Sequence, residues 1–168
     1  MIALQITDIK KMMQALLYSA SFDSFSLQEV SVTKDISFFL EGRLHPEYYT
    51  SEDRSADPEL DARTFATWGQ YRDLTAAFIR GEKSPLSFKL VLQASDSYMQ
   101  KLLKNPEFTA DPALAKALVL TFRYENGALT CLTGTAFTTF VPDKSLDKLW
   151  DNAIRKSLDH MEISFEEM

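Results

Sequence analysis

Side chains capable of covalent chemistry are few in this sequence. The two histidines are His45, beside Pro46, and His160, near the C-terminus, and the single cysteine is Cys131. Nucleophilic catalysis needs a serine, threonine or cysteine beside a base, usually histidine, and neither histidine lies in a motif of that kind. The alternation around Cys131 predicts a thiol that faces the core opposite Phe122, where cysteine acts as a small hydrophobic residue. We therefore expect no catalytic residue and lean away from an enzyme.

Metal and phosphate sites are also not expected. The sequence His160-Met161-Glu162 is too sparse for a ligand set, and the acidic segment lacks the spacing and central glycine of a calcium loop. The five glycines are scattered, so none forms a phosphate-binding loop. We expect neither a metal nor a cofactor. A pair of catalytic carboxylates that meets only in space stays open, although nothing in the sequence points to one.

Two sets of residues are candidates for binding. The first set, a ligand or interface site, is His45, Tyr48 and Tyr49, which flank an acidic loop at residues 47–61. Exposed tyrosines suit interfaces because they combine contact area with a polar tip. The alternative is that both tyrosines cover the edge of the core.

The second candidate set is basic. Lys10 and Lys11 lie opposite the apolar stripe of one predicted helix, and Lys101 and Lys104 lie opposite that of another. Such a face can bind phosphate groups of a nucleic acid. The alternative is that the four lysines form ordinary solvated helix surfaces, so nucleic-acid binding is a hypothesis that we do not favour.

Length, composition and charge set the class of protein. A chain of 168 residues, 45% of them hydrophobic, fits one domain with a substantial core. The net charge is −6, and the loop at 47–61 carries −5 of it, which is typical of a solvated surface excursion. The N-terminus lacks a basic region, the longest uncharged run resembles a hairpin, and the lone cysteine argues against a secreted scaffold. We expect a cytoplasmic location and no membrane segment.

Hydrophobic periodicity predicts the elements of the first half. Ile2, Leu4 and Ile6 alternate as in a strand, and Thr7 is the expected N-cap of a helix whose stripe runs from Ile9 to Leu17. A strand pair is predicted at 25–33 and 36–44. Thr67 and Gln70 match a capping box that begins a further helix, and the predicted inner face of that helix is Tyr71, Leu74 and Phe78.

The second half repeats a similar pattern. A strand at 86–92, a helix that begins after Ser95 and a strand at 118–124 lead to Asn126-Gly127, a strong signal for a type I′ hairpin. The returning strand is expected to break at Gly134 and to resume at 136–141. A last helix carries Leu146, Leu149, Trp150, Ala153 and Ile154 on one face, and the tail at 163–165 either docks as a short strand or frays.

The predicted fold is therefore α+β: a mainly antiparallel sheet with about four helices in a single domain, 1–168. The order β-α-β-β, helix, β-α-β-β, helix also suggests half-repeats at 1–80 and 85–160. Met13-Gln14 with Leu16-Leu17 matches Met99-Gln100 with Leu102-Leu103. An internal duplication is one hypothesis, and an ordinary α+β sandwich is the alternative.

Three segments support a resemblance over the full length. These are residues 6–10 (ITDIK), 85–89 (PLSFK) and 123–131 (RYENGALTC). Through them the chain resembles an uncharacterised family of small bacterial proteins, a domain of unknown function, which implies no activity. A weaker resemblance, in residues 129–137, is to the DNA sliding-clamp fold, a doubled βαβββ unit whose helices face DNA. By that resemblance Lys10, Lys11, Lys101 and Lys104 would face inward, but a clamp subunit has two or three such domains.

These observations predict a non-enzymatic binding or protein-interaction domain. Two alternatives stay open: a small-molecule-binding protein or enzyme with its site near the acidic loop, and a weak nucleic-acid binder with a clamp-like fold. A protein partner or a second copy of the chain is compatible with the sequence, which names neither.

Overall fold

A computed structural model describes residues 1–168 and confirms the α+β class. One antiparallel sheet contains seven strands in the order β3-β2-β4-β5-β6-β1-β7. The strands are β1 (Ala3–Ile6), β2 (Ser26–Thr33), β3 (Ser37–Glu41), β4 (Ser87–Gln93), β5 (Ala115–Glu125), β6 (Ala128–Phe137) and β7 (Phe165–Glu167). The helices are α1 (Ile9–Leu17), α2 (Ser51–Ala56), α3 (Trp68–Ile79), α4 (Asp96–Leu103) and α5 (Ser145–His160).

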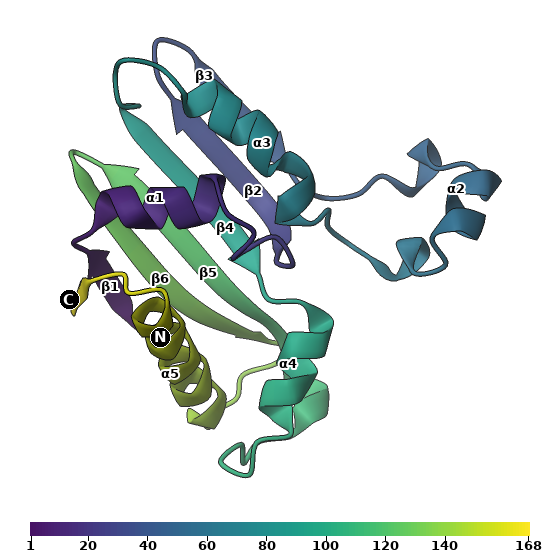
Figure 1. Cartoon of the computed structure of the whole chain (residues 1–168). Helices are drawn as coiled ribbons and strands as arrows, with labels where there is room; N and C mark the ends of the chain where they lie inside the picture. Colours follow the sequence, from purple (N-terminus) through teal and green to yellow (C-terminus); the bar gives the residue numbers. More distant parts are fainter.

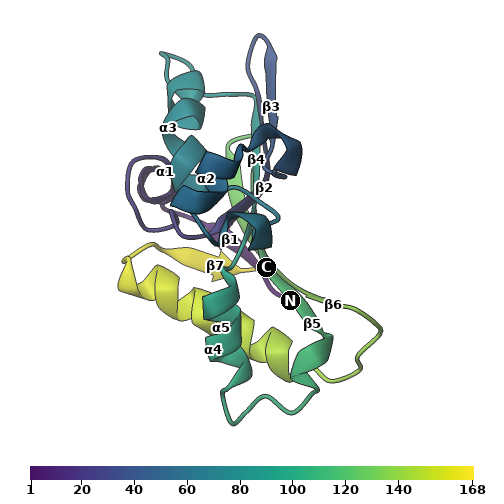
Figure 2. The same cartoon turned by 90° about the vertical axis from the view of Figure 1, so that its right-hand side faces the viewer.

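The helices that build the body lie on one side of the sheet, as the edge view shows (Figure 2). Helix α1 packs beside α3, and α4 packs beside α5 (Figure 1). The alternating side chains of the strands place every second residue under these helices, which produces one hydrophobic cluster. Its largest members are Trp68, Trp150, Phe88 and Phe122, all less than 2% exposed.

The hairpin of β5 and β6 confirms the predicted turn and register. Asn126 and Gly127 have φ values of 52° and 77°, the positive values that a type I′ turn requires. Phe122 lies opposite Cys131, as expected. The expected break at Gly134 is wrong, because Gly134 pairs with Val119 in the β5–β6 ladder and β6 is continuous to Phe137. The strand ends there and does not extend to residue 141 as expected.

Two details of the helices differ from expectation. The N-cap of α1 is Asp8 and not Thr7, because the Asp8 carboxylate accepts a hydrogen bond from the Lys11 backbone N–H at 3.1 Å. The capping box of Thr67 and Gln70 is confirmed at α3. Of the predicted inner face, Phe78 packs against the core as expected, whereas Tyr71 and Leu74 do not. Tyr71 is 36% exposed and Leu74 is 52% exposed. The buried residues of α3 are instead Trp68, Thr75 and Ala76.

A hydrogen bond sets the orientation of α3 about its own axis. The indole N–H of Trp68 donates a hydrogen bond to the Leu16 carbonyl at the end of α1, at 2.9 Å and fully buried. A buried tryptophan N–H needs such a partner, and α1 supplies it. Trp68 therefore fixes which side of α3 faces the core, and Tyr71 and Leu74 are turned toward solvent.

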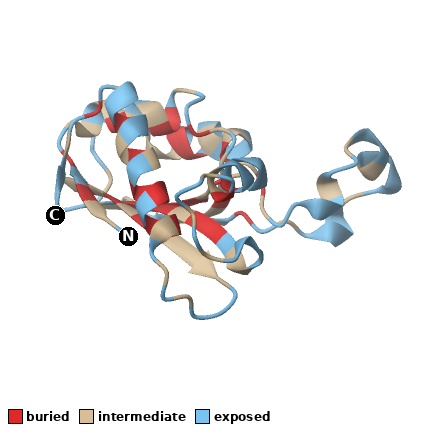
Figure 3. Cartoon of the chain, turned by 90° about the horizontal axis from the view of Figure 1, so that it is seen from below, coloured by how far each residue is buried: buried red, intermediate tan, exposed pale blue.

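The acidic loop belongs to a longer excursion, residues 43–65, that we call the arm. It leaves the body after β3 and returns before α3, and it contains α2 with two short 3₁₀ turns (Pro46–Tyr48 and Leu60–Ala62). None of its residues is buried (Figure 3), which fits the expected surface excursion. At its root a Cβ on Gly42 would lie 1.8 Å from the Leu27 carbonyl oxygen, so only glycine allows the chain to leave the sheet there.

The two half-units occupy different places in the sheet. Strand β4 lies between β2 and β5, whereas β1, its counterpart in the first half, lies between β6 and β7. The strand order thus gives no support to a duplication, which stays a hypothesis. At the C-terminus, β7 pairs with β1, which is the docked alternative for the tail. None of the helices is long and apolar enough to cross a membrane.

Candidate functional site

A cleft of about 500 Å³ opens between α1 and the loop that joins α3 to β4. We call it the basic cleft. Its apolar wall comes from Ile9, Met13, Leu17, Ile79 and Tyr124, and its rim carries Lys10, Arg80 and Lys83. A volume of this size suits a small molecule or one bulky side chain of another protein.

Helix geometry explains the apolar wall. Ile9, Met13 and Leu17 are spaced four residues apart, so they form one strip along α1. Leu17 is buried, whereas Ile9 and Met13 are half-buried because the cleft leaves part of their surface open. Lys10 follows Ile9 directly and therefore lies beside the strip, at the rim.

The opposite side of the cleft depends on how α3 ends. The Lys34 ammonium donates hydrogen bonds to the carbonyls of Phe78, at 3.0 Å, and Arg80, at 3.3 Å. Carbonyls in the last turn of a helix lack helical partners, and a cation there also suits the helix dipole. Lys34 thus fixes the point where the chain turns, and the loop then presents the exposed side chains of Arg80 and Lys83.

The three rim cations have no anionic partner within the chain. None of its ion pairs includes Lys10, Arg80 or Lys83. Glu82 is the one carboxylate that lines the cleft. The cleft therefore combines an apolar wall with an excess of positive charge, an arrangement that can hold an anionic group attached to an apolar body.

The structure brings His45, Tyr48 and Tyr49 together at the start of the arm. All three line a cavity of about 200 Å³, which Leu40 and Tyr71 close on the side of the body. The tyrosine rings meet edge to face, with 5.6 Å between centroids, and Tyr48 is 82% exposed. Tyr48 therefore does not cover the core edge. A role for these residues in ligand or partner binding stays a prediction.

A single arginine holds this part of the arm in place. The Arg54 guanidinium donates hydrogen bonds to the carbonyls of Tyr49 and Pro46, both at 2.8 Å, and pairs with Asp61 at 2.9 Å. A planar guanidinium with five donors suits such bridging. The arm has no buried residues of its own, so these polar contacts of Arg54 hold its backbone together.

The four predicted lysines do not form one face. Lys10 lies at the basic cleft, whereas the Lys11 ammonium is held by the carbonyl of Glu162 at 2.9 Å and by its carboxylate at 3.6 Å. Lys101 and Lys104 lie on and just after α4, which packs against α5 at another end of the sheet from α1 (Figure 1). A nucleic acid that contacted all four lysines through its phosphates would have to reach from α1 to α4.

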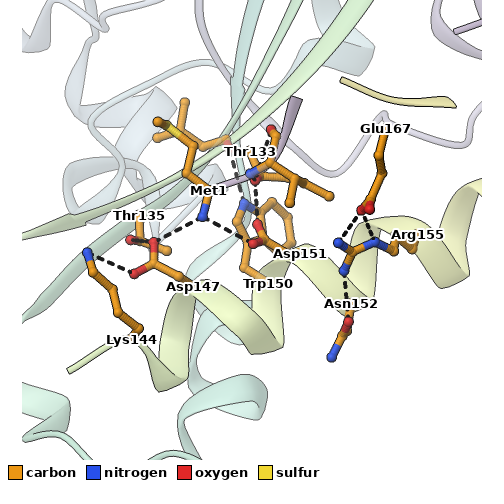
Figure 4. Close-up of polar contacts among 12 residues, drawn as sticks. Met1, Thr133, Thr135, Lys144, Asp147, Trp150, Asp151, Asn152, Arg155 and Glu167 are labelled. Carbon is orange, nitrogen blue, oxygen red and sulfur yellow. Dashed lines mark hydrogen bonds and ion pairs between the residues drawn. The ribbon is translucent and has the colours of Figure 1, made fainter. Parts of the chain in front are cut away.

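A buried polar network, absent from the sequence-based predictions, ties α5 to the sheet (Figure 4). The Thr133 hydroxyl on β6 donates to Asp151, and the Thr135 hydroxyl donates to Asp147 at 2.7 Å. Asp147 and Asp151 are both buried residues, 9% and 7% exposed. The amino group of Met1 lies 3.1 Å from Asp151 and 3.6 Å from Asp147. Each of the two carboxylates therefore has its partners within the chain.

The sequence contains part of the signal for the basic cleft and for the network of Asp147 and Asp151. Lys10 was identified as an anion-binding candidate, but Arg80 and Lys83 belong to a loop whose contact with α1 is tertiary. Asp147 and Asp151 are four residues apart on the predicted last helix, beside Leu146 and Trp150 in its apolar stripe. That position at the margin of the stripe was the signal for their burial.

Comparisons with known proteins agree with the predicted resemblance. A family model described as a family of unknown function, DUF5721, matches residues 15–166. Searches of curated proteins and of solved structures gave no match, so the sliding-clamp resemblance has no support there. The match covers β2 to β6, most of β7 and helices α2 to α5, and it leaves out β1 and the first six residues of α1. The chain belongs to the DUF5721 family, a family of unknown function.

Proposed function

We propose that the protein is a non-enzymatic binding domain that takes an anionic ligand with an apolar body in the basic cleft. The observation that carries the proposal is the convergence of Lys10, Arg80 and Lys83, none of them ion-paired, on a wall of half-buried apolar side chains. The single, fully buried cysteine fits a reducing, cytoplasmic setting.

The ligand class follows from the chemistry of the lining. The apolar wall favours an aliphatic or aromatic body, since burying apolar surface contributes about 25 cal/mol per Å². The rim favours a carboxylate, sulfonate or phosphate, because a charge-assisted hydrogen bond from Arg or Lys is stronger than a neutral one. A neutral apolar ligand would gain only the first of these contributions.

A matched pair of probes tests this class. The anion 8-anilinonaphthalene-1-sulfonate and the uncharged N-phenyl-1-naphthylamine share one aromatic skeleton and differ in the sulfonate. We expect the anion to bind the folded full chain more tightly, with an affinity that falls as salt rises, because exposed charges are screened. Fluorescence titration measures both affinities, and decanoate should displace the anion.

Two double variants locate the site. Arg80→Ala with Lys83→Ala should weaken sulfonate binding about tenfold, which corresponds to roughly 1.4 kcal/mol, and should leave the neutral probe within twofold. Lys101→Ala with Lys104→Ala removes the same charge from α4 and should change neither. Equal affinity of the two probes, or equal loss in both variants, would contradict the proposal. Retention of the chain on DNA that depends on Lys101 and Lys104 would instead favour the nucleic-acid alternative.

A further inference from the structure

The arm and α3 together enclose a small aromatic cavity, which we call the tyrosine pocket. Tyr48 and Tyr49 of the arm and Tyr71 of α3 line this space of about 200 Å³. The rings of Tyr48 and Tyr49 stand at 80° to each other, with 5.6 Å between centroids, so they form two walls of a corner. Tyr71 reaches the same space from the body of the protein.

The three tyrosines leave ring surface open to a ligand. None of them is buried, and Tyr48 is 82% and Tyr71 36% exposed. Burial of aromatic surface stabilises a fold, and these rings contribute little of it. A cavity lined by three uncovered rings from two parts of the chain is therefore suited to binding rather than to packing.

The bottom of the tyrosine pocket is apolar. Gly42 and Ala66 are its buried lining residues, and Leu40 and Leu44 are half-buried beside them. The backbone there is already paired, since the Ala66 N–H donates to the Gly42 carbonyl at 2.8 Å and the Leu44 N–H to the Thr64 carbonyl at 2.9 Å. A primary ammonium would lose hydrogen bonds to water in such a space, whereas a fully methylated nitrogen has no N–H to leave unpaired.

The acidic surroundings favour a positively charged ligand. Glu41 lines the tyrosine pocket, and Glu47 begins the segment 47–61, which carries a charge of −5. The side chains of Glu41 and Glu47 are 61% and 77% exposed. A negative potential of this kind raises the local concentration of cations.

The basic residues of the lining do not cancel this preference. Arg43 supplies the one guanidinium, which lies 5.3 Å from the centroid of the Phe65 ring and 3.9 Å from the Glu41 carboxylate. Phe65 is not part of the lining, so the guanidinium is drawn away from the tyrosines. The His45 Nδ1 lies 3.6 Å from the Glu47 carboxylate, which offsets the charge of a protonated imidazole.

We infer that the tyrosine pocket binds a trimethylammonium group. The faces of aromatic rings attract a cation within about 6 Å of their centroids, and quaternary ammonium ligands are recognised in this way. The methyl groups also fill the apolar bottom. Arg54 holds the carbonyls of Tyr49 and Pro46, both at 2.8 Å, so the arm is ordered before the ligand arrives and binding costs less entropy.

Three small probes test the chemistry in the full chain. Choline and 3,3-dimethylbutan-1-ol have the same shape, with a charged nitrogen in one and a carbon in the other, and ethanolamine keeps the charge without the methyl groups. We expect choline to bind at least about fivefold more tightly than either. Nuclear magnetic resonance of the tyrosine rings, titrated at constant ionic strength, measures the three affinities. Equal affinity for choline and the neutral alcohol would overturn the inference.

A second arm identifies the source of the group. Choline and capped trimethyllysine carry the same trimethylammonium group on a small molecule and on a protein side chain. Equal affinities would identify a free small cation as sufficient, and tighter binding of trimethyllysine would identify a methylated protein. Binding of capped unmethylated lysine as tightly as of trimethyllysine contradicts a site for the methylated group.

Substitutions separate ring faces from apolar area. Tyr48→Leu and Tyr71→Leu should each weaken choline binding by about fivefold, whereas Tyr48→Phe and Tyr71→Phe, which keep the ring, should stay within about twofold of the wild type. Phe140→Leu removes an 87% exposed ring that does not line the pocket and should change nothing. Equal losses in the leucine and phenylalanine variants would exclude recognition by the ring faces.

The tyrosine pocket and the basic cleft are tested independently. Tyr48 and Tyr71 do not line the basic cleft, so their leucine variants should bind the sulfonate probe as the wild type does. An unchanged melting temperature and sulfonate affinity in a variant that has lost choline binding would show that the loss is local. Choline affinity that falls with Arg80→Ala and Lys83→Ala, and not with the tyrosine variants, would place the cation elsewhere and refute the inference.

Discussion

At the scale of single residues, burial decides whether a reactive group reacts. Cys131 points from β6 into the core and has no accessible surface. Removal from water disfavours the thiolate and raises the pKa of the Cys131 thiol from 9.0 to about 12. A thiol with so little thiolate is a poor nucleophile. The alternation of apolar residues, which predicts that Cys131 lies opposite Phe122 in the core, therefore also predicts an unreactive thiol.

We expect the Cys131 thiol of the native chain not to react with an aromatic disulfide reagent at pH 8. In guanidinium the exposed thiol should react and release one equivalent of the reagent's aromatic thiolate. The free energy of unfolding should also fall as pH rises above about 9, since the unfolded thiol ionises there and the folded one does not until about 12. The measurement is absorbance of the released thiolate, with Cys131→Ala as the blank. Complete reaction of the native chain within minutes would show that the thiol is accessible.

At the scale of elements, polar contacts fix how a helix sits on the sheet. The apolar stripe of α5 was predicted from sequence and is confirmed: Leu146, Leu149, Trp150 and Ile154 are buried. An apolar stripe specifies which side of a helix faces the core. Apolar contacts alone do not fix closely how far the helix is rotated about its axis or shifted along it. Asp151 and Asp147, bonded to Thr133 and Thr135, add that precision.

Asp151→Ala should lower the free energy of unfolding by about 2 kcal/mol, because it leaves the buried Thr133 hydroxyl with only the Ile2 carbonyl, at 3.5 Å, as an acceptor. Asp159→Ala, an exposed position on the same helix, should change it by less than about 0.5 kcal/mol. Urea unfolding followed by tryptophan fluorescence measures both, with Trp150 as a local reporter. Equal effects at the two positions would mean that the network contributes nothing to docking.

At the scale of the whole molecule, the arm is an addition to a complete body. It contributes no buried residue, and Arg54 holds it by hydrogen bonds to its own backbone. The Leu44 N–H donates to the Thr64 carbonyl at 2.9 Å, so the two strands of its neck already lie as in a hairpin. The body should therefore fold without the rest of the arm.

Replacing residues 45–63 by Asn-Gly closes the neck with a type I′ turn. We expect the melting temperature to change by less than about 3 °C, as for a surface change of under 1 kcal/mol. Sulfonate binding in the basic cleft should persist. Calorimetry measures the melting temperature, and the fluorescence titration described above measures sulfonate binding. Loss of the cooperative transition would show that the arm supports the core.

The sequence predicted elements better than faces and sites. Cap residues such as Ser95 and the pair Thr67 and Gln70 act on their own helix, so the helix starts at α4 and α3 were predictable. The face of α3 was not, because the partner of the Trp68 indole is a carbonyl on α1, 52 residues away. The basic cleft escaped prediction for the same reason: Arg80 and Lys83 meet Lys10 only after folding.

By itself the sequence determined the α+β class, the hairpin at Asn126-Gly127, the solvated acidic excursion and the buried thiol. Each of these follows from short-range periodicity, turn conformation or composition, which act within a few residues of chain. Only the tertiary structure decided the strand order, the exposed β3 edge and the cations gathered at the basic cleft. These depend on contacts between distant segments, whose free energies come from packing and burial that no local pattern encodes.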